Sequence, residues 1–293
     1  MHLFRGTGVA LVTPFTAEGA VDWPALRRVV QHVIDGGVEV LVPLGTTAES
    51  VVLSPDEQKQ VAETVLEVNA GQRKVLLGCG GNDTRKVAEA QAAFEKAFPQ
   101  IDGFLSVTPY YNRPTQAGLE LHYNTLARAT DKPIVLYNVP PRTGCNLLPE
   151  TVLKLAHAHR NIVAVKEASG NLEQGMQIVA QQPTHFVTLS GDDILGLSGL
   201  AVGFQGVISV VGNVAPRPYS ELVRAALAGD FARAGQLHYK LLSLMQANFS
   251  EGNPAGVKAA LAALHICEPH VRLPLAGASQ MLLQHMRELV PVA

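Results

Sequence analysis

The sequence predicts an α/β fold, a (β/α)8 TIM barrel with a small helical extension at its C-terminal end. Short apolar runs alternate with longer amphipathic segments, the runs number eight, and they span about 225 residues, the size typical of such a barrel. A doubly wound parallel sheet is the alternative. That fold more often has five or six strands and a glycine-rich first turn, and neither GxGxxG nor a P-loop pattern occurs.

The composition is that of a globular, slightly apolar chain. Its 293 residues are 47% hydrophobic and 16% charged, enough for one large core or two ordinary domains. A net charge of −2 gives no basic surface for nucleic acid, and no apolar stretch reaches the length of about 18 residues that predicts a membrane span. Cys79, Cys145 and Cys267 form no CxxC pair, and the ten histidines form no HExxH. We therefore expect a reducing cytoplasm, no disulfide framework and no metal.

The apolar runs are interpreted as strands buried on both faces, because helices cover one side and the neighbouring layer covers the other. The first follows Arg5 and stops at Thr13-Pro14, which is typical of a strand rather than a signal peptide. The runs comprise residues 9–12, 38–44, 75–78, 103–107, 134–137, 162–165, 186–189 and 206–210.

Helix start signals separate these strands. Residues 22–24 (Asp-Trp-Pro) open one helix, and Ser54 opens another as N-cap ahead of Pro55. Thr84 and Pro149 mark two more.

Four further segments after the eighth strand have helical spacing: residues 219–228, 231–248, 254–264 and 279–289. One of these helices would cover the eighth strand and complete the barrel, and the other three are more than a barrel needs. We therefore expect a barrel domain with the active site at residues 1–228 and a C-terminal helical domain at residues 229–293. No linker separates the two, so the second is expected to pack on the first.

Chemistry in such a barrel lies at the C-terminal ends of the strands. Those ends carry more hydroxyl groups than core packing requires: Thr13, Gly45-Thr46-Thr47, Cys79, Tyr110-Tyr111, Tyr137-Asn138, Lys166-Glu167, Gly191-Asp192 and Ser209.

Lys166 is the sharpest feature of this set. It follows the apolar run 162–165, so its stem is expected to rise from the barrel interior. Burial favours the neutral amine, which can attack a carbonyl and form an imine. The alternative is a lysine that reaches solvent or pairs with Glu167.

Tyr137 ends the preceding strand, so it should face the same pocket and could carry protons to and from an imine. Its alternative is a core tyrosine bonded to backbone. The turn of Thr46 and Thr47 offers hydroxyl and N–H groups suited to a small carboxylate, or else simply a helix cap. The loop at residues 109–114 could be a surface turn or an interface.

These residues lie in motifs spread in order over almost the whole chain: GTGVALVTPF at 6–15, GTTAES at 45–50, SVTPYYNRPTQAG at 106–118, YNVPPRTG at 137–144, VKEASGN at 165–171, LSGDD at 189–193 and GVISVVGN at 206–213. Together they closely resemble the dihydrodipicolinate synthase family, also called 4-hydroxy-tetrahydrodipicolinate synthase. Its superfamily includes N-acetylneuraminate lyase and keto-deoxy sugar-acid aldolases.

The resemblance implies a Schiff-base-forming lyase of lysine and diaminopimelate biosynthesis that needs no cofactor. It makes Lys166 the imine-forming residue, Tyr137 its proton donor and acceptor, and Thr46 a member of the proton relay. Tyr111 would complete that relay from the neighbouring subunit of a homotetramer built as a dimer of dimers. The matching substrate-binding positions are Thr47 and Ile208 for pyruvate and Arg142 for the carboxylate of L-aspartate 4-semialdehyde.

Two departures from the family pattern bear on activity and control. Ala48 stands where the family more commonly has Gly, which leaves both threonines in place. In a possible regulatory pocket for L-lysine, Ser50, Asn82 and Tyr110 keep a polar character, whereas Lys86 replaces a glutamate. Other positions matching that pocket are Val51, Pro55 and Gln58, the last two standing where inhibited members have histidines.

Two other functions remain open from the sequence. A sibling aldolase could use the same lysine on N-acetylneuraminate or a keto-deoxy sugar acid, although the paired threonines and Arg142 favour the synthase. A catalytically silent binding barrel is a more distant possibility, against which the intact set of Lys166, Tyr137, Thr46 and Tyr111 argues.

Overall fold

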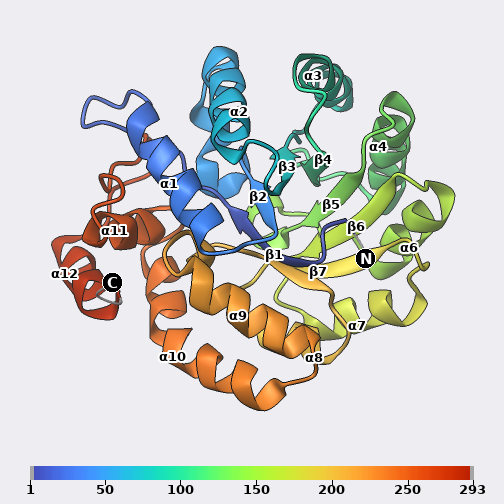
Figure 1. The fold of residues 1–293 in the computed structure, drawn as a ribbon. Helices are drawn as coiled ribbons and strands as arrows, with labels where there is room; N and C mark the ends of the chain where they lie inside the picture. The colour runs from blue at the N-terminus through green and yellow to red at the C-terminus, as the bar shows by residue number, and fades with distance from the viewer. Residues whose placement is uncertain (1–2, 291–293) are drawn as a thin grey trace.

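The computed structural model describes residues 3–290, which form a closed barrel of eight parallel strands with helices around it (Figure 1). The strands neighbour one another in chain order, and β1 closes the ring by pairing with both β2 and β8. The predicted barrel is confirmed, and the doubly wound sheet is excluded. Residues 1–2 and 291–293, the outer ends of the two predicted domains, lie outside the described residues. The strands are β1 (Gly6–Ala10), β2 (Val40–Val42), β3 (Lys74–Gly78), β4 (Gly103–Val107), β5 (Ile134–Asn138), β6 (Ile162–Glu167), β7 (Val187–Ser190) and β8 (Gly206–Ser209).

Helices surround the strands and extend beyond β8. The helices are α1 (Trp23–Asp35), α2 (Pro55–Asn69), α3 (Thr84–Ala97), α4 (Gln116–Ala129), α5 (Pro140–Thr143), α6 (Pro149–Ala158), α7 (Leu172–Gln181), α8 (Gly196–Ala201), α9 (Pro216–Leu227), α10 (Phe231–Ser250), α11 (Ala255–Ala263) and α12 (Gln280–Leu289). Three 3-10 turns lie at strand ends or between elements, namely η1 (Thr46–Ala48), η2 (Ser50–Val52) and η3 (Val211–Asn213).

Side-chain caps fix where α1 and α2 begin, and both predicted starts are confirmed. The Asp22 carboxylate accepts a hydrogen bond from the Ala25 N–H at 2.9 Å. Ser54 and Glu57 form a capping box, in which each side chain accepts from the other residue's N–H, at 3.2 and 2.8 Å. These bonds satisfy amide groups that the first turn of a helix leaves without partners.

The predicted helix start at Thr84 is confirmed by α3, and the Asp83 carboxylate caps this helix by accepting from the N–H groups of Arg85 and Lys86. The predicted bounds of the first strand were wrong by a few residues. The strand predicted at residues 9–12 is β1, which ends at Ala10. The Val12 N–H donates instead to the Asn213 side chain at 3.2 Å, so the chain stays tied to the barrel after the strand ladder ends.

Alternate residues of all eight strands fill the barrel interior, as two-residue periodicity requires. They form one buried apolar cluster that includes Ala10, Val42, Leu76, Leu105, Tyr137, Ala164, Leu189 and Ile208. Lys166 follows Ala164 by two positions on β6, so its side chain leaves the strand on the same interior side. The strand pattern therefore directs Tyr137, Lys166 and Ile208 toward one region.

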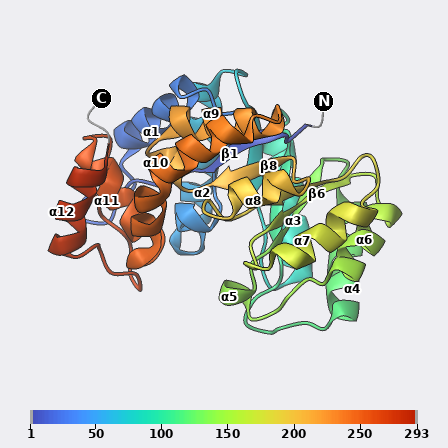
Figure 2. The ribbon, with the colours of Figure 1, turned by 90° about the horizontal axis from the view of Figure 1, so that it is seen from below.

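The C-terminal helices pack against one side of the barrel. Seen from below, α10, α11 and α12 lie together beside α1 and α9 (Figure 2). A large apolar cluster joins the C-terminal helices to the barrel helices. It contains Leu244 of α10 and Val257 of α11 together with Val29 of α1 and Leu222 of α9. Within residues 3–290, no helix combines the length and apolar character needed to cross a bilayer.

Candidate active site

Lys166 and Tyr137 meet at the C-terminal ends of neighbouring strands. They are register partners on β6 and β5, and the Lys166 Nζ lies 4.2 Å from the centre of the Tyr137 ring. Their exposed fractions are 5% and 6%. A primary amine thus lies over the ring of a phenol in a largely water-excluded place, so a nucleophile and a group able to transfer protons share one site.

The space beside Lys166 depends on Gly191, which follows β7. A Cβ at this position would lie 3.0 Å from Lys166 Cε and 2.6 Å from the Cβ of Ala168. The approach to Ala168 is closer than real Cβ atoms come, and the approach to Lys166 would require the lysine stem to shift by a few tenths of an ångström. Absence of a side chain at Gly191 therefore lets the amine take its position.

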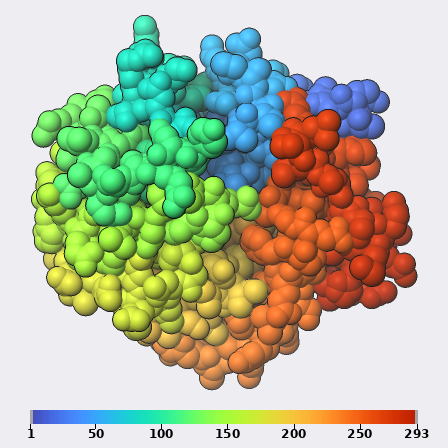
Figure 3. All heavy atoms as spheres, turned by 180° about the vertical axis from the view of Figure 1, so that it is seen from behind, coloured from blue at the N-terminus to red at the C-terminus, as the bar shows by residue number. Residues whose placement is uncertain are grey.

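A cavity of about 460 Å³ opens at this end of the barrel, and Thr46, Tyr137 and Arg142 line it. Its wall runs through segments near residues 44–58, 78–94 and 105–143. The space-filling view shows this face hollowed near its centre between the blue, cyan and green parts of the chain (Figure 3). The volume lies in the range of small-molecule sites.

The turn that carries Thr46 and Thr47 has a constrained backbone. Leu44 before it and Glu49 after it both have positive φ, 58° and 54°. Gly78 allows the close approach, because a Cβ there would lie 2.2 Å from the Leu44 carbonyl oxygen. Positive φ is costly for residues other than glycine, so the surroundings must hold this turn.

Thr47 is 2% exposed, and its hydroxyl accepts a hydrogen bond from the Asn253 amide at 2.9 Å. Its own proton is consequently free to point elsewhere. The turn presents hydroxyl and N–H groups of the kind that bind a carboxylate.

Ile208 lies on β8 opposite Gly8 and is 2% exposed. Val210 and Val211 follow it closely in the chain. Their N–H groups donate hydrogen bonds to the buried Asp193 carboxylate, at 3.0 and 2.8 Å. Burial raises the pKa of Asp193, against the lowering effect of these bonds. Asp193 thereby fixes the end of β8, where Ile208 stands.

Glu167 does not pair with Lys166, although it is adjacent in sequence. One of its oxygens accepts from the Ser169 N–H at 2.7 Å, and the other accepts from the amides of Asn138 and Gln174, at 3.0 and 2.9 Å. The side-chain amide oxygen of Asn138 in turn accepts from the Leu147 N–H at 2.9 Å. This buried network joins Asn138 to Leu147, the residues on either side of the segment that carries Arg142.

Several other strand-end residues are buried. The Ser209 hydroxyl accepts from the Gly212 N–H at 2.9 Å, and Thr13 is fully buried, with no hydrogen-bond partner for its hydroxyl among the described residues. Cys79 lines the cavity, but burial raises the pKa of its thiol to about 12, so it stays protonated at neutral pH. These residues shape the site without offering it a nucleophile.

Tyr111 lies apart from the other predicted catalytic residues. Its side chain is 91% exposed in the single chain, and its φ is 73°. The neighbouring Tyr110 lines the cavity instead. Within the single chain, Tyr111 therefore lies outside the group formed by Lys166, Tyr137 and Thr46.

Most residues of the predicted regulatory pocket adjoin the same cavity. Ser50, Val51, Gln58 and Tyr110 line it, and the Asn82 amide donates to the Tyr110 carbonyl at 3.1 Å. Lys86 is exposed in the first turn of α3.

Comparison with known proteins gives a consistent result. The model of the dihydrodipicolinate synthetase family matches residues 3–292. A 4-hydroxy-tetrahydrodipicolinate synthase of Flavobacterium psychrophilum is 46% identical over 282 residues, 96% of each chain. The crystal structure of dihydrodipicolinate synthase from Aquifex aeolicus superposes with a TM-score of 0.94 at 43% identity, covering 98% of this chain and 97% of that one. A structure described as the first monomeric dihydrodipicolinate synthase variant has a TM-score of 0.95 at 40% identity and covers 98% and 96%.

Proposed function

The chain belongs to the dihydrodipicolinate synthetase family, and we propose on that premise that it condenses pyruvate with L-aspartate 4-semialdehyde to give 4-hydroxy-tetrahydrodipicolinate. The observation that carries this proposal is the buried contact of Lys166 Nζ with the Tyr137 ring, at 4.2 Å. This contact lies at the C-terminal ends of the barrel strands, where enzymes of this fold carry out their chemistry. The pathway served would be the synthesis of diaminopimelate and lysine.

The proposed reaction begins when the neutral Lys166 amine attacks the ketone carbon of pyruvate. A carbinolamine forms, loses water and leaves an imine on the lysine. Loss of a proton from the methyl group gives an enamine, whose carbon attacks the aldehyde carbon of the semialdehyde while the aldehyde oxygen takes up a proton. The substrate's own amine then displaces Lys166 by transimination, which closes the ring and returns the free lysine.

The other residues divide between proton transfer and binding. Tyr137 would donate and accept protons at the imine, in a relay with Thr46 and with Tyr111 of a neighbouring subunit. Thr47, through its hydroxyl and N–H, and Ile208, through its carbonyl, would hold pyruvate. The covalent lysine is itself the electron sink, so this account requires no metal or organic cofactor.

An assay of substrate choice tests the proposed function. We expect pyruvate with L-aspartate 4-semialdehyde to be consumed far faster than N-acetylneuraminate or a keto-deoxy sugar acid is cleaved. The reverse preference would make the chain a sugar-acid aldolase that uses the same lysine.

Arg142 provides the first specific prediction. Its guanidinium lines the cavity and can bind a carboxylate with two parallel hydrogen bonds. Arg142→Ala should cost about 1.5–3 kcal/mol in recognition of the semialdehyde, measured as a lower kcat/KM for that substrate. Arg113→Ala, which removes a neighbouring exposed guanidinium bound to the Gly144 carbonyl, is the matched control. Unchanged KM and kcat/KM in Arg142→Ala would rule out the assigned role.

We propose that the enzyme is a cytoplasmic homotetramer built as a dimer of dimers, with residues 1–228 carrying the active site and residues 229–293 forming the helical domain. The exposed Tyr111 supports an interface at the site. The three free cysteines fit a reducing compartment. Size-exclusion chromatography with light scattering tests the assembly against the monomeric state of the relative described above.

Feedback by L-lysine provides the second prediction. An ammonium at Lys86 in place of a carboxylate reverses the sign of a contact with the ammonium of L-lysine, an interaction of about 4 kcal/mol at 4 Å when the effective dielectric constant is near 20. The attraction lost and the repulsion gained together amount to about 8 kcal/mol. Screening reduces this change, but even a quarter of it, about 2 kcal/mol, would weaken binding about thirtyfold. We expect weak or no inhibition when L-lysine is titrated into the condensation assay. Half-inhibition by L-lysine below millimolar concentration would contradict the expected insensitivity. In that case Lys86→Glu should not make the enzyme more sensitive to L-lysine.

A further inference from the structure

Lys258, on α11 of the C-terminal helices, is a buried cation with no part in the proposed chemistry. Its Nζ lies 2.6 Å from Glu49 Oε1 and 2.8 Å from the His270 carbonyl oxygen. The side chains of Lys258 and Glu49 are 0% and 1% exposed. The ammonium also lies 4.1 Å from the centre of the Phe15 ring. Burial lowers the pKa of Lys258, and the Glu49 carboxylate opposes that effect, so each charge depends on the other.

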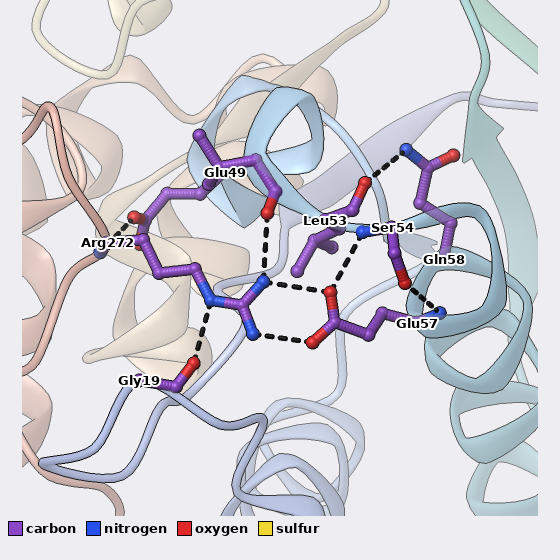
Figure 4. A network of polar contacts seen from close by, with 8 residues as sticks. Gly19, Glu49, Leu53, Ser54, Glu57, Gln58 and Arg272 are labelled. Atoms are coloured by element: carbon purple, nitrogen blue, oxygen red, sulfur yellow. Dashed lines mark hydrogen bonds and ion pairs between the residues drawn. The ribbon is translucent and has the colours of Figure 1, made fainter.

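Arg272 holds the same glutamate from a second direction (Figure 4). Its N–H donates to Glu49 Oε2 at 2.9 Å. Its guanidinium binds both oxygens of Glu57 at 2.8 and 2.5 Å, and the carbonyl oxygens of Gly19 and Val52. This pairing lowers the pKa of Glu57 to about 2. Arg272 thereby connects the C-terminal segment to both ends of the stretch from Glu49, which precedes η2, to Glu57, in the first turn of α2.

These contacts converge on the turn that carries Thr46 and Thr47. Glu49 closes that turn in a left-handed conformation, and its N–H donates to the Thr46 carbonyl at 3.0 Å. Asn253 binds the Thr47 hydroxyl from the residues just before α11. The C-terminal helices thus supply partners for both the strained end of the turn and one of its hydroxyl groups.

We propose that Lys258 is a positioning residue for pyruvate, which acts through Glu49 to hold the Thr46–Thr47 turn in the geometry that receives the substrate carboxylate. This rests on the proposed function, because it takes that turn to be the pyruvate-binding element. Without the Lys258 ammonium, the buried Glu49 carboxylate has lost its counter-charge, and water or a backbone rearrangement must compensate. The left-handed conformation at Glu49 then loses the contact that outweighs its strain. The C-terminal helices are, in this view, part of the substrate site.

The test measures imine formation with pyruvate alone, trapped with borohydride over a range of pyruvate concentrations. Lys258→Met removes the charge with little change of volume. We expect it to raise the half-saturating pyruvate concentration about tenfold or more, the effect of losing one charge-assisted contact, while trapping at saturation reaches the parent level. Lys154→Met is the matched control, since it breaks an ion pair with Glu120 on the outside of the barrel and should leave half-saturation unchanged.

The double variant Glu49→Gln/Lys258→Met separates positioning from stability. Removing both charges leaves no uncompensated carboxylate, so its melting temperature should exceed that of Lys258→Met. Its half-saturating pyruvate concentration should nevertheless stay high, because the turn still lacks its ionic anchor. If Lys258→Met does not fold, the double variant carries the test by itself.

Unchanged half-saturation in folded Lys258→Met, or recovery of pyruvate affinity in the double variant, overturns the inference alone. The parent chain's failure to trap pyruvate would overturn the proposed function and this inference with it. The aldehyde substrate takes no part in the measurement, so a wrong acceptor assignment does not affect it.

Discussion

Lys166→Ala is expected to abolish condensation, lowering kcat by roughly four orders of magnitude or more. Loss of a covalent nucleophile removes the intermediate through which every later step proceeds, and the surrounding groups can provide only the residual rate of a non-covalent site. The measurement is the initial rate of pyruvate consumption in the presence of L-aspartate 4-semialdehyde.

Lys154→Ala is the control for this result, because it also removes a lysine amine but on the outside of the barrel. Circular dichroism should show both variants folded, since the alanine at position 166 leaves no charge buried. Substantial turnover by folded Lys166→Ala would mean that another group forms the imine or that none is formed.

Mixing inactive subunits is expected to restore activity if Tyr111 works across a subunit interface. Tyr111→Phe removes a proton-relay hydroxyl and should lower kcat about 10²- to 10⁴-fold. When this variant exchanges freely with Lys166→Ala, half of the dimers are hybrids, and one site in each hybrid has both residues intact. Recovery should therefore approach about a quarter of the parent activity.

The matched control mixes Tyr137→Phe with Lys166→Ala. Tyr137 and Lys166 are neighbours within one barrel, 4.2 Å from ring centre to Nζ, so no hybrid can reunite them and no recovery is expected. Absence of recovery from the Tyr111→Phe mixture, with hybrid dimers confirmed by native mass spectrometry, would contradict sharing of Tyr111 between subunits.

The sequence predicted those parts of the molecule that depend on local pattern. Eight apolar runs predicted the barrel, and strand order predicted that Tyr137 and Lys166 would adjoin. Strand ends were predicted less closely: β1 ends two residues before residue 12, because the Val12 N–H donates to the side chain of Asn213 rather than to a neighbouring strand. Such a contact, 201 positions apart in sequence, leaves no periodic signal.

Long-range polar partners were the main feature that the sequence did not reveal. Glu49 was recognisable as part of GTTAES, but its partners Lys258 and Arg272 lie 209 and 223 positions away. Adjacency in sequence makes Glu167 a candidate partner of Lys166, yet Glu167 lies on the opposite side of β6 and accepts hydrogen bonds from Asn138 and Gln174. Alternation along the strand could have predicted that separation, since adjacent residues point to opposite faces.

Borohydride trapping followed by peptide mass spectrometry tests the central claim most directly. Reduction converts an imine into a stable amine, so incubation with pyruvate and borohydride should leave one covalent adduct on the peptide that contains Lys166. Lys166→Ala should carry none. An adduct on another lysine, or undiminished labelling of Lys166→Ala, would contradict the assignment of Lys166 as the Schiff-base residue.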